Sequence, residues 1–138
     1  MKKYFKEKFH NILRDQGLKA GVSPVQNLDN EKGRVNEVKR LGILDRDLGS
    51  ERRYNTLTQV ASYLTNCKHS MINILDSNIQ HCKVSYGLNI ADKMLSAEVP
   101  REITVCQFSL ETPNKPLIIE NLLEDERTKN MSKMVGVP

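Results

Sequence analysis

The chain has 138 residues, a length typical of a single domain that can bury a core without disulfides or metals. Hydrophobic residues make up 38% of it and charged residues 28%, and the sequence has neither an apolar run of 18 residues nor a signal-peptide pattern. We therefore expect a cytoplasmic protein without a transmembrane segment. Its three cysteines are widely spaced and form no CxxC motif, so we expect neither a disulfide framework nor a metal site.

The net charge of +4 is concentrated near the N-terminus. Residues 1–40 hold ten Lys or Arg against five Asp or Glu, or +5, which leaves 11 against 12, or −1, for residues 41–138. A basic segment can meet phosphate groups or an anionic membrane. A solvated helix is the commoner explanation, and we expect no nucleic-acid partner.

Residues 1–34 are interpreted as a basic leader helix followed by a linker. In MKKYFKEKFHNILRD, apolar residues recur at helical spacing and lysines take the other side. The next segment, GLKAGVSPVQNLDNEKG, is rich in glycine and polar residues, which is typical of a loop. We therefore predict a leader over residues 1–34 and a domain over residues 35–138.

Two helices are predicted to open this domain. Apolar residues at every third position indicate a helix over residues 35–48. A second helix over residues 51–65 is indicated by a stripe of Tyr54, Leu57, Thr58, Ala61 and Leu64. The exposed apolar positions of this pair, Val38 and Leu41 among them, are expected to form a parallel homodimer interface within residues 35–65.

Two strands joined by a tight turn are predicted next. SMINILD, residues 70–76, is apolar on both faces, whereas IQHCKVSYG, residues 79–87, alternates. Ser77 and Asn78 between them favour a tight turn, so the two segments should form a hairpin. The alternation predicts one apolar face on the second strand, made of Cys82, Val84 and Tyr86.

One more helix and one more strand are predicted after a polar loop. EITVCQFSLE, residues 102–111, has apolar residues at helical spacing and is predicted to be a short helix. PLIIEN, residues 116–121, opens with a proline and is predicted to be a strand. The complete order of elements indicates an α+β fold.

Several segments together resemble the GAF domains of bacterial sensor kinases and diguanylate cyclases. They are RLGILDRDLGSERRYNTLTQVASYL, SMINILDSNIQHCKVSYGL and PREITVCQFSLETPNKPLIIENLLEDERTKNMSKMVGVP, and they cover most of residues 36–138. The resemblance implies a central antiparallel sheet, with the N-terminal helical pair on one face and a small-molecule pocket on the other. It also implies a non-catalytic module of bacterial two-component or cyclic-dinucleotide signalling, which senses a ligand, dimerises and acts on an effector such as a kinase or a cyclase.

GAF domains continue past the position of Pro138 with further strands, the last of which lies beside the strand at residues 70–76. We therefore expect an incomplete domain whose C-terminal strands are missing. The strand at residues 70–76 should then have an open edge, which is prone to association.

The implied pocket would be lined by side chains from the hairpin and from the short helix. Core packing explains many of these residues equally well. The candidates are Ile72, Ile74, Asp76, Val84, Tyr86, Cys106, Gln107 and Leu110.

The polar and reactive residues also have alternative roles. Cys106 would attach a bilin only in a light-sensing GAF domain, where a histidine follows the cysteine, and here Gln107 follows. A redox role for Cys106 lacks an adjacent base, so packing is favoured. Asp76 could take part in acid–base chemistry, but a turn role explains it as well. A surface role is expected for His81.

Two alternative functions therefore remain open. One is an interaction and dimerisation domain without a ligand, and the other is a redox-active GAF enzyme. The identity of any small-molecule ligand or cofactor is not indicated by the sequence.

Overall fold

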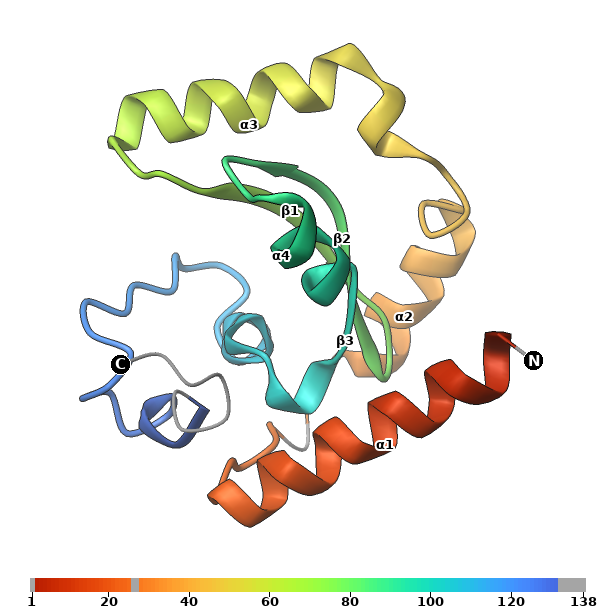
Figure 1. The fold of residues 1–138 in the computed structure, drawn as a ribbon, viewed down its shortest axis with the longest axis vertical. Coiled ribbons are helices and arrows are strands. Elements are labelled where there is room, and N and C mark those ends of the chain that lie inside the picture. The colour runs from red at the N-terminus through yellow and green to blue at the C-terminus, as the bar shows by residue number, and fades with distance from the viewer. Residues whose placement is uncertain (1, 26–27, 132–138) are drawn as a thin grey trace. The chain divides into compact units, whose positions relative to one another are not determined.

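The helices and strands of the chain fall into two units in the computed structural model, which describes residues 2–25 and 28–131 (Figure 1). One unit consists of residues 30–99. The other combines residues 1–29 with residues 100–138. The segment predicted as a leader therefore shares a unit with the C-terminal part of the chain.

A three-stranded antiparallel sheet forms the centre of the 30–99 unit. Its strands are β1 (Ser70–Leu75), β2 (Ile79–Tyr86) and β3 (Glu98–Pro100), in the order β1-β2-β3. The N–H of Asp76 donates to the carbonyl of Ile79 at 2.9 Å, which closes the turn between β1 and β2. The α+β class and the predicted hairpin are confirmed, whereas β3 lies in a segment for which no strand was predicted.

The second strand of the hairpin contains a bulge at Lys83. Ile72 pairs with Val84, but the next residue of β1, Asn73, pairs with Cys82. Because side chains alternate between the faces of a strand, the additional residue moves Cys82 to the face opposite Val84. The prediction that Cys82 and Val84 share an apolar face is therefore wrong.

Four helical segments accompany the sheet: α2 (Glu31–Arg40), the 3₁₀ helix η1 (Leu48–Ser50), α3 (Arg52–Thr65) and α4 (Ile90–Ser96). The helix predicted over residues 35–48 begins earlier, at Glu31, and ends at Arg40. Gly42 follows with a φ of 57°, a left-handed conformation that terminates helices. The helix α4 lies in the segment predicted as a polar loop.

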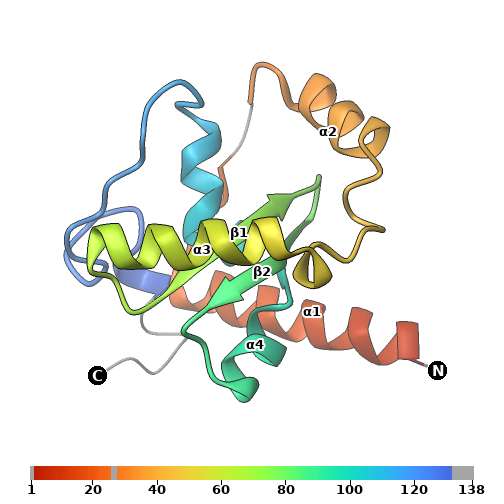
Figure 2. The same ribbon diagram turned by 90° about the horizontal axis from the view of Figure 1, so that it is seen from above.

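The long helix α3 lies along β1 and β2 (Figure 2). It turns the small side chains of Thr58 and Ser62 inward, where both are buried. The other helix of the predicted pair, α2, reaches the hairpin at its turn, where the guanidinium of Arg34 donates to the carbonyls of Leu75 and Asp76. A pair of helices was predicted to cover one sheet face. Of this pair, α3 lies along the strands, whereas α2 contacts the hairpin at its turn.

The second unit joins α1 (Lys2–Ala20) to residues after β3. Arg14 of α1 forms an ion pair of 2.7 Å with Glu102 of the 3₁₀ helix η2 (Arg101–Ile103). The core of this unit consists of Val22, Phe108 and Met131, with Val25, Val105 and Leu117 packed against it. The hydrophobic residues that follow α1 therefore anchor it to the C-terminal part of the chain.

Two predictions for this second unit are wrong. The segment 102–111 forms no α-helix but two 3₁₀ segments, η2 and η3 (Val105–Leu110). The segment 116–121 forms no strand, and the side chain of Ile118 within it is largely exposed. Residues of high β-propensity form strands only where a partner strand is available, and this segment has none among the described residues.

Candidate functional site

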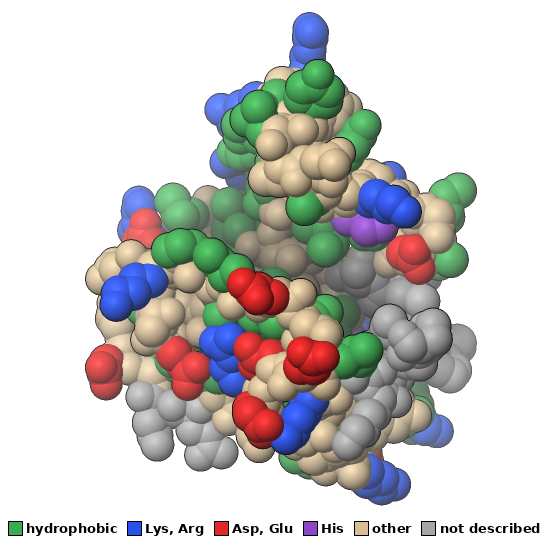
Figure 3. All heavy atoms as spheres, turned by 90° about the vertical axis from the view of Figure 1, so that its left-hand side faces the viewer, with side chains coloured by type: hydrophobic (Ala, Val, Ile, Leu, Met, Phe, Trp, Pro, Cys, Tyr) green, Lys and Arg blue, Asp and Glu red, His purple; other side chains and the backbone are tan. Residues whose placement is uncertain are grey.

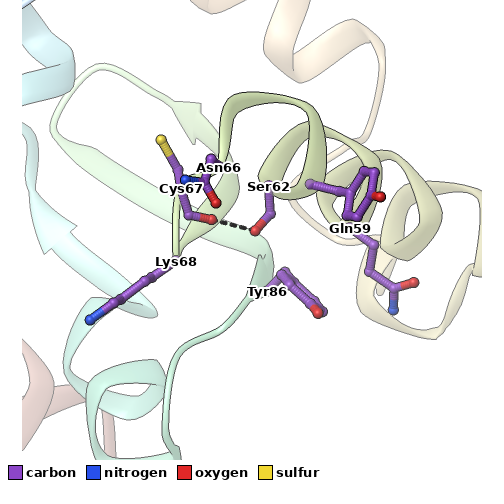
Figure 4. A pocket seen from close by; sticks show the side chains of 7 residues that line it. Gln59, Ser62, Asn66, Cys67, Lys68 and Tyr86 are labelled. Carbon is purple, nitrogen blue, oxygen red and sulfur yellow. Dashed lines mark hydrogen bonds between the residues drawn. The ribbon is translucent and has the colours of Figure 1, made fainter.

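A groove opens where α3 ends and the chain turns into β1. It has a volume of about 590 Å³ and lies entirely within the 30–99 unit (Figure 4). Its walls come from the last two turns of α3, the connection to β1, and the end of β2. The lining residues are Gln59, Ser62, Tyr63, Asn66, Cys67, Lys68 and Tyr86.

The floor of the groove is fixed by the cap of α3. Asn66 adopts a left-handed conformation with a φ of 52°, which ends the helix and reverses the chain. The N–H of Cys67 then donates to the carbonyl of Ser62 at 3.1 Å, and the hydroxyl of Ser62 donates back to the carbonyl of Cys67 (Figure 4). The hydroxyl of Ser62 is therefore engaged in holding the backbone.

The groove offers aromatic and polar surfaces with a single cation among its lining side chains. Tyr63 and Tyr86 supply rings and hydroxyls, Gln59 supplies an amide, and Lys68 lines the groove with its ammonium directed away from α3 (Figure 4). The lining residues include neither a carboxylate nor a histidine that could act as a base for the thiol of Cys67. Such a surface can bind a small molecule through ring contacts and hydrogen bonds.

Tyr86 is the predicted site residue that lines this groove. It shares a face of the hairpin with three other candidates, because Ile72 pairs with Val84 and Ile74 lies two residues along β1. Val84 is buried, so it serves as core at this position. The structure thus brings Ile72, Ile74, Val84 and Tyr86 together on one sheet face.

Asp76 lies at the opposite end of the hairpin, where it organises the turn. Its Oδ1 accepts hydrogen bonds from the N–H groups of Asn78 at 2.7 Å and Ile79 at 2.6 Å. Its Oδ2 lies 3.0 Å from Nε2 of His81, and Nδ1 of the same ring lies 3.8 Å from a carboxylate oxygen of Glu98. The turn role considered for Asp76 is confirmed.

The charge of Asp76 is favoured by these contacts. Burial by itself raises the pKa of the carboxyl group, but the N–H of Ile79, the side chain of His81 and the N–H of Asn78 lower it by more. The pKa of Asp76 therefore lies below its ordinary value. This side chain acts as a structural anion at the turn, and His81 is one of its partners.

The remaining candidates, Cys106, Gln107 and Leu110, lie on η3 in the other unit. Gln107 is only 1% exposed. Its Oε1 accepts from the N–H of Val25 at 2.8 Å, and its Nε2 donates to the carbonyl of Glu102 at 2.7 Å. Its amide is therefore used to connect parts of its own unit.

Sequence reasoning missed most of the groove. The connection between α3 and β1 contains Asn66, and asparagine tolerates the left-handed conformation that ends helices. That signal could have located the helix end. It could not have indicated that Gln59 and Tyr86, which are distant in the sequence, line the same groove.

Comparisons with known proteins leave the family unassigned. Over the part of the chain that the structure describes, no cluster of three or more His, Cys, Asp or Glu side chains is arranged to hold a metal ion. In the same part, no helix combines the length and apolar character needed to cross a membrane. The sequence matches no protein-family model and no curated protein.

Proposed function

We propose that this chain is a non-catalytic regulatory module that associates with a second copy through α3 and binds a small molecule in the groove at the end of that helix. Its effector would be an attached or associated signalling protein such as a kinase or a cyclase. The α+β fold, the exposed face of α3 and the groove support this proposal. The resemblance of residues 36–138 to GAF domains supports it independently.

The observation that carries the proposal is an apolar stripe on the outward face of α3. Leu57, Val60 and Leu64 are 60%, 47% and 77% exposed, and Ala61 between them is exposed as well. These positions have the i, i+3, i+4, i+7 spacing of one helix face. Hydrophobic side chains also gather in the upper part of Figure 3, where α3 lies.

A contiguous exposed stripe of this kind is typical of an interaction surface. Burying one leucine side chain contributes about 1.5–3 kcal/mol, so pairing of two such stripes can drive association. The buried face of the same helix carries Thr58 and Ser62. The more hydrophobic face of α3 is thus the one that its own unit leaves uncovered.

Sedimentation velocity over a range of protein concentrations tests the self-association. We expect a reversible monomer–dimer equilibrium that Leu64→Glu shifts at least tenfold towards monomer, because a charge replaces a buried leucine at the interface. Gln59→Glu is the matched control, since it adds the same charge to α3 about 140° around the helix from Leu64. A wild-type protein that stays monomeric at every concentration contradicts the proposal.

Native mass spectrometry of freshly purified protein separates the ligand-binding module from its ligand-free alternative. A retained small molecule that is lost in Tyr86→Ala, while dimerisation persists, supports binding in the groove. Retention of the same molecule by Tyr86→Ala would place the ligand elsewhere. A wild-type dimer without any retained molecule would favour an interaction and dimerisation domain.

A further inference from the structure

We infer that two copies of this chain pair through α3 in antiparallel orientation, about a two-fold axis midway between Val60 and Ala61. This inference rests on the proposed self-association and specifies its geometry. The occupant of the exposed stripe is therefore the same stripe of a second copy.

The order of side chains along the stripe is the first argument for this geometry. Leu57, Val60, Ala61 and Leu64 are symmetric about the midpoint of Val60 and Ala61, with a leucine at each end and smaller side chains in the centre. In an antiparallel pair about that midpoint, Leu57 of one copy faces the partner's Leu64, and Val60 faces the partner's Ala61. A two-fold interface requires such a self-complementary surface.

The central pair of small side chains also suits close packing of the two helices. Interaxial distances of about 8–10 Å depend on the size of the side chains at the contact. Val60 opposite the partner's Ala61 permits close approach at the axis, and the leucines pack on both sides of it. In a parallel pair in the same register, Ala61 would face Ala61 and Leu64 would face Leu64, which leaves a narrow and a wide contact side by side.

The charges at the ends of α3 give the second argument. The first turn holds Arg52 and Arg53 and no acidic residue, and the last turn holds no basic residue. A parallel pair would gather four arginines at one end, of which the two copies of Arg53 are each paired with Glu51 at 2.6 Å. An antiparallel pair separates them by the length of α3, about 21 Å, which exceeds the Debye length of about 8–10 Å in physiological salt.

The antiparallel pair also places each arginine pair beside the C-terminal end of the partner's helix, where the helix dipole is negative and favours cations. Lys68 follows this end, but its side chain points away from α3 (Figure 4). The arginines at the start of α3 are therefore placed more favourably in the antiparallel arrangement.

The extent of the stripe sets the strength of the association. Contact between two helices of 14 residues covers less than the roughly 800 Å² per partner of a standard stable interface. We therefore expect a dissociation constant of about micromolar order or weaker, typical of a reversible contact.

Disulfide trapping tests the geometry. In a Cys67→Ser background, which removes an exposed thiol, we would prepare Leu57→Cys, Ala61→Cys and Leu64→Cys and oxidise each with copper phenanthroline. A disulfide forms only when the two Cβ atoms are about 3.5–4.5 Å apart. Circular dichroism confirms that each variant is folded before oxidation.

The antiparallel pair predicts a distinct pattern of crosslinks. Ala61→Cys, next to the axis, should form dimers by itself. Leu57→Cys mixed with Leu64→Cys should form dimers, while each of these variants alone should not, because identical positions are about 10 Å apart along the axis. Crosslinking of Leu57→Cys alone and Leu64→Cys alone would show a parallel pair and overturn the inference.

Other outcomes separate the inference from the proposed function. If sedimentation shows a dimer but none of the variants crosslinks, α3 is not the interface, so the inference and the α3 contact of the proposed function both fail, while self-association through another surface stands. If sedimentation shows only monomer, the proposed self-association fails and the inference fails with it.

Discussion

Replacing Asp76 by alanine should destabilise the protein substantially more than replacing it by asparagine. Alanine removes both hydrogen bonds from Oδ1 to the N–H groups of Asn78 and Ile79, together with the contact between Oδ2 and His81. Asparagine keeps a side-chain oxygen that can accept from the same two N–H groups. The two variants therefore separate the geometry of the turn from the charge of the carboxylate.

The size of the effect can be worked from these contacts. A hydrogen bond to a charged group contributes about 1.5–3 kcal/mol, but water can replace part of this at an exposed N–H such as that of Asn78. We expect a loss of about 2–4 kcal/mol for Asp76→Ala and about 1 kcal/mol for Asp76→Asn. These losses are large against a total stability of about 5–15 kcal/mol.

Urea unfolding followed by circular dichroism at pH 7 measures both losses. The midpoint should fall for each variant without a change in the slope, which shows that stability and not compactness has changed. Equal losses in the two variants would refute the reasoning, because the backbone hydrogen bonds would then contribute nothing beyond the charge. A loss below about 0.5 kcal/mol for Asp76→Ala would show that the turn does not depend on this side chain.

The pH dependence of the difference in unfolding free energy between wild type and Asp76→Asn supplies a second check. Since the contacts of Asp76 lower its pKa in the folded protein, its ionised form contributes stability that is fully present above the unfolded pKa of about 4. This contribution is lost as the pH falls through the lower, folded pKa. The stability difference between wild type and Asp76→Asn should therefore shrink below about pH 4.

Further predictions concern the other unit and the thiols. Gln107→Leu should lower stability by about 2–4 kcal/mol in urea unfolding, because it leaves the partly buried N–H of Val25 and carbonyl of Glu102 without this partner; a neutral substitution would show that those groups find other partners. In an NMR titration, the hydrogen bonds from Arg127 should hold the pKa of Asp125 at about 2, and Arg127→Gln should raise it, whereas an unchanged titration would exclude Arg127 as the cause. A thiol reagent should label Cys67, which is exposed, faster than the partly buried Cys106; faster labelling of Cys106 would contradict the packing role expected for it.

Local chemistry was sufficient to predict the hairpin and the presence of α3. The strands at residues 70–75 and 79–86 follow from alternating and apolar patterns on either side of Ser77 and Asn78. The carboxylate of Asp76 acts within three residues of its own position, so its turn role was also within reach of sequence reasoning. The helical spacing of apolar residues over 51–65 predicted α3 within one residue at its start.

Contacts between distant segments decided the rest of the fold. A strand was predicted over residues 116–121 from its composition, but a strand also needs a partner to accept its hydrogen bonds. The bulge at Lys83 changes the face of Cys82, and no local pattern signals it. The segment predicted as a leader shares a core with Phe108 and Met131, which a reading along the sequence could not anticipate.

For the two candidate surfaces, the stripe on α3 and the groove at its end, sequence and tertiary structure also determine different features. Periodicity predicted a common stripe of Tyr54, Leu57, Thr58, Ala61 and Leu64 on α3, because side chains three and four residues apart share a helix face. Only the tertiary structure decided that Leu57, Ala61 and Leu64 of this stripe face outward, whereas Thr58 packs inward beside Ser62. Likewise, only the fold placed Tyr86 beside the end of α3 to form the groove. The physical reason is that periodicity fixes the angle between side chains around a helix, whereas the direction in which a face points depends on the surfaces that other segments bring against it.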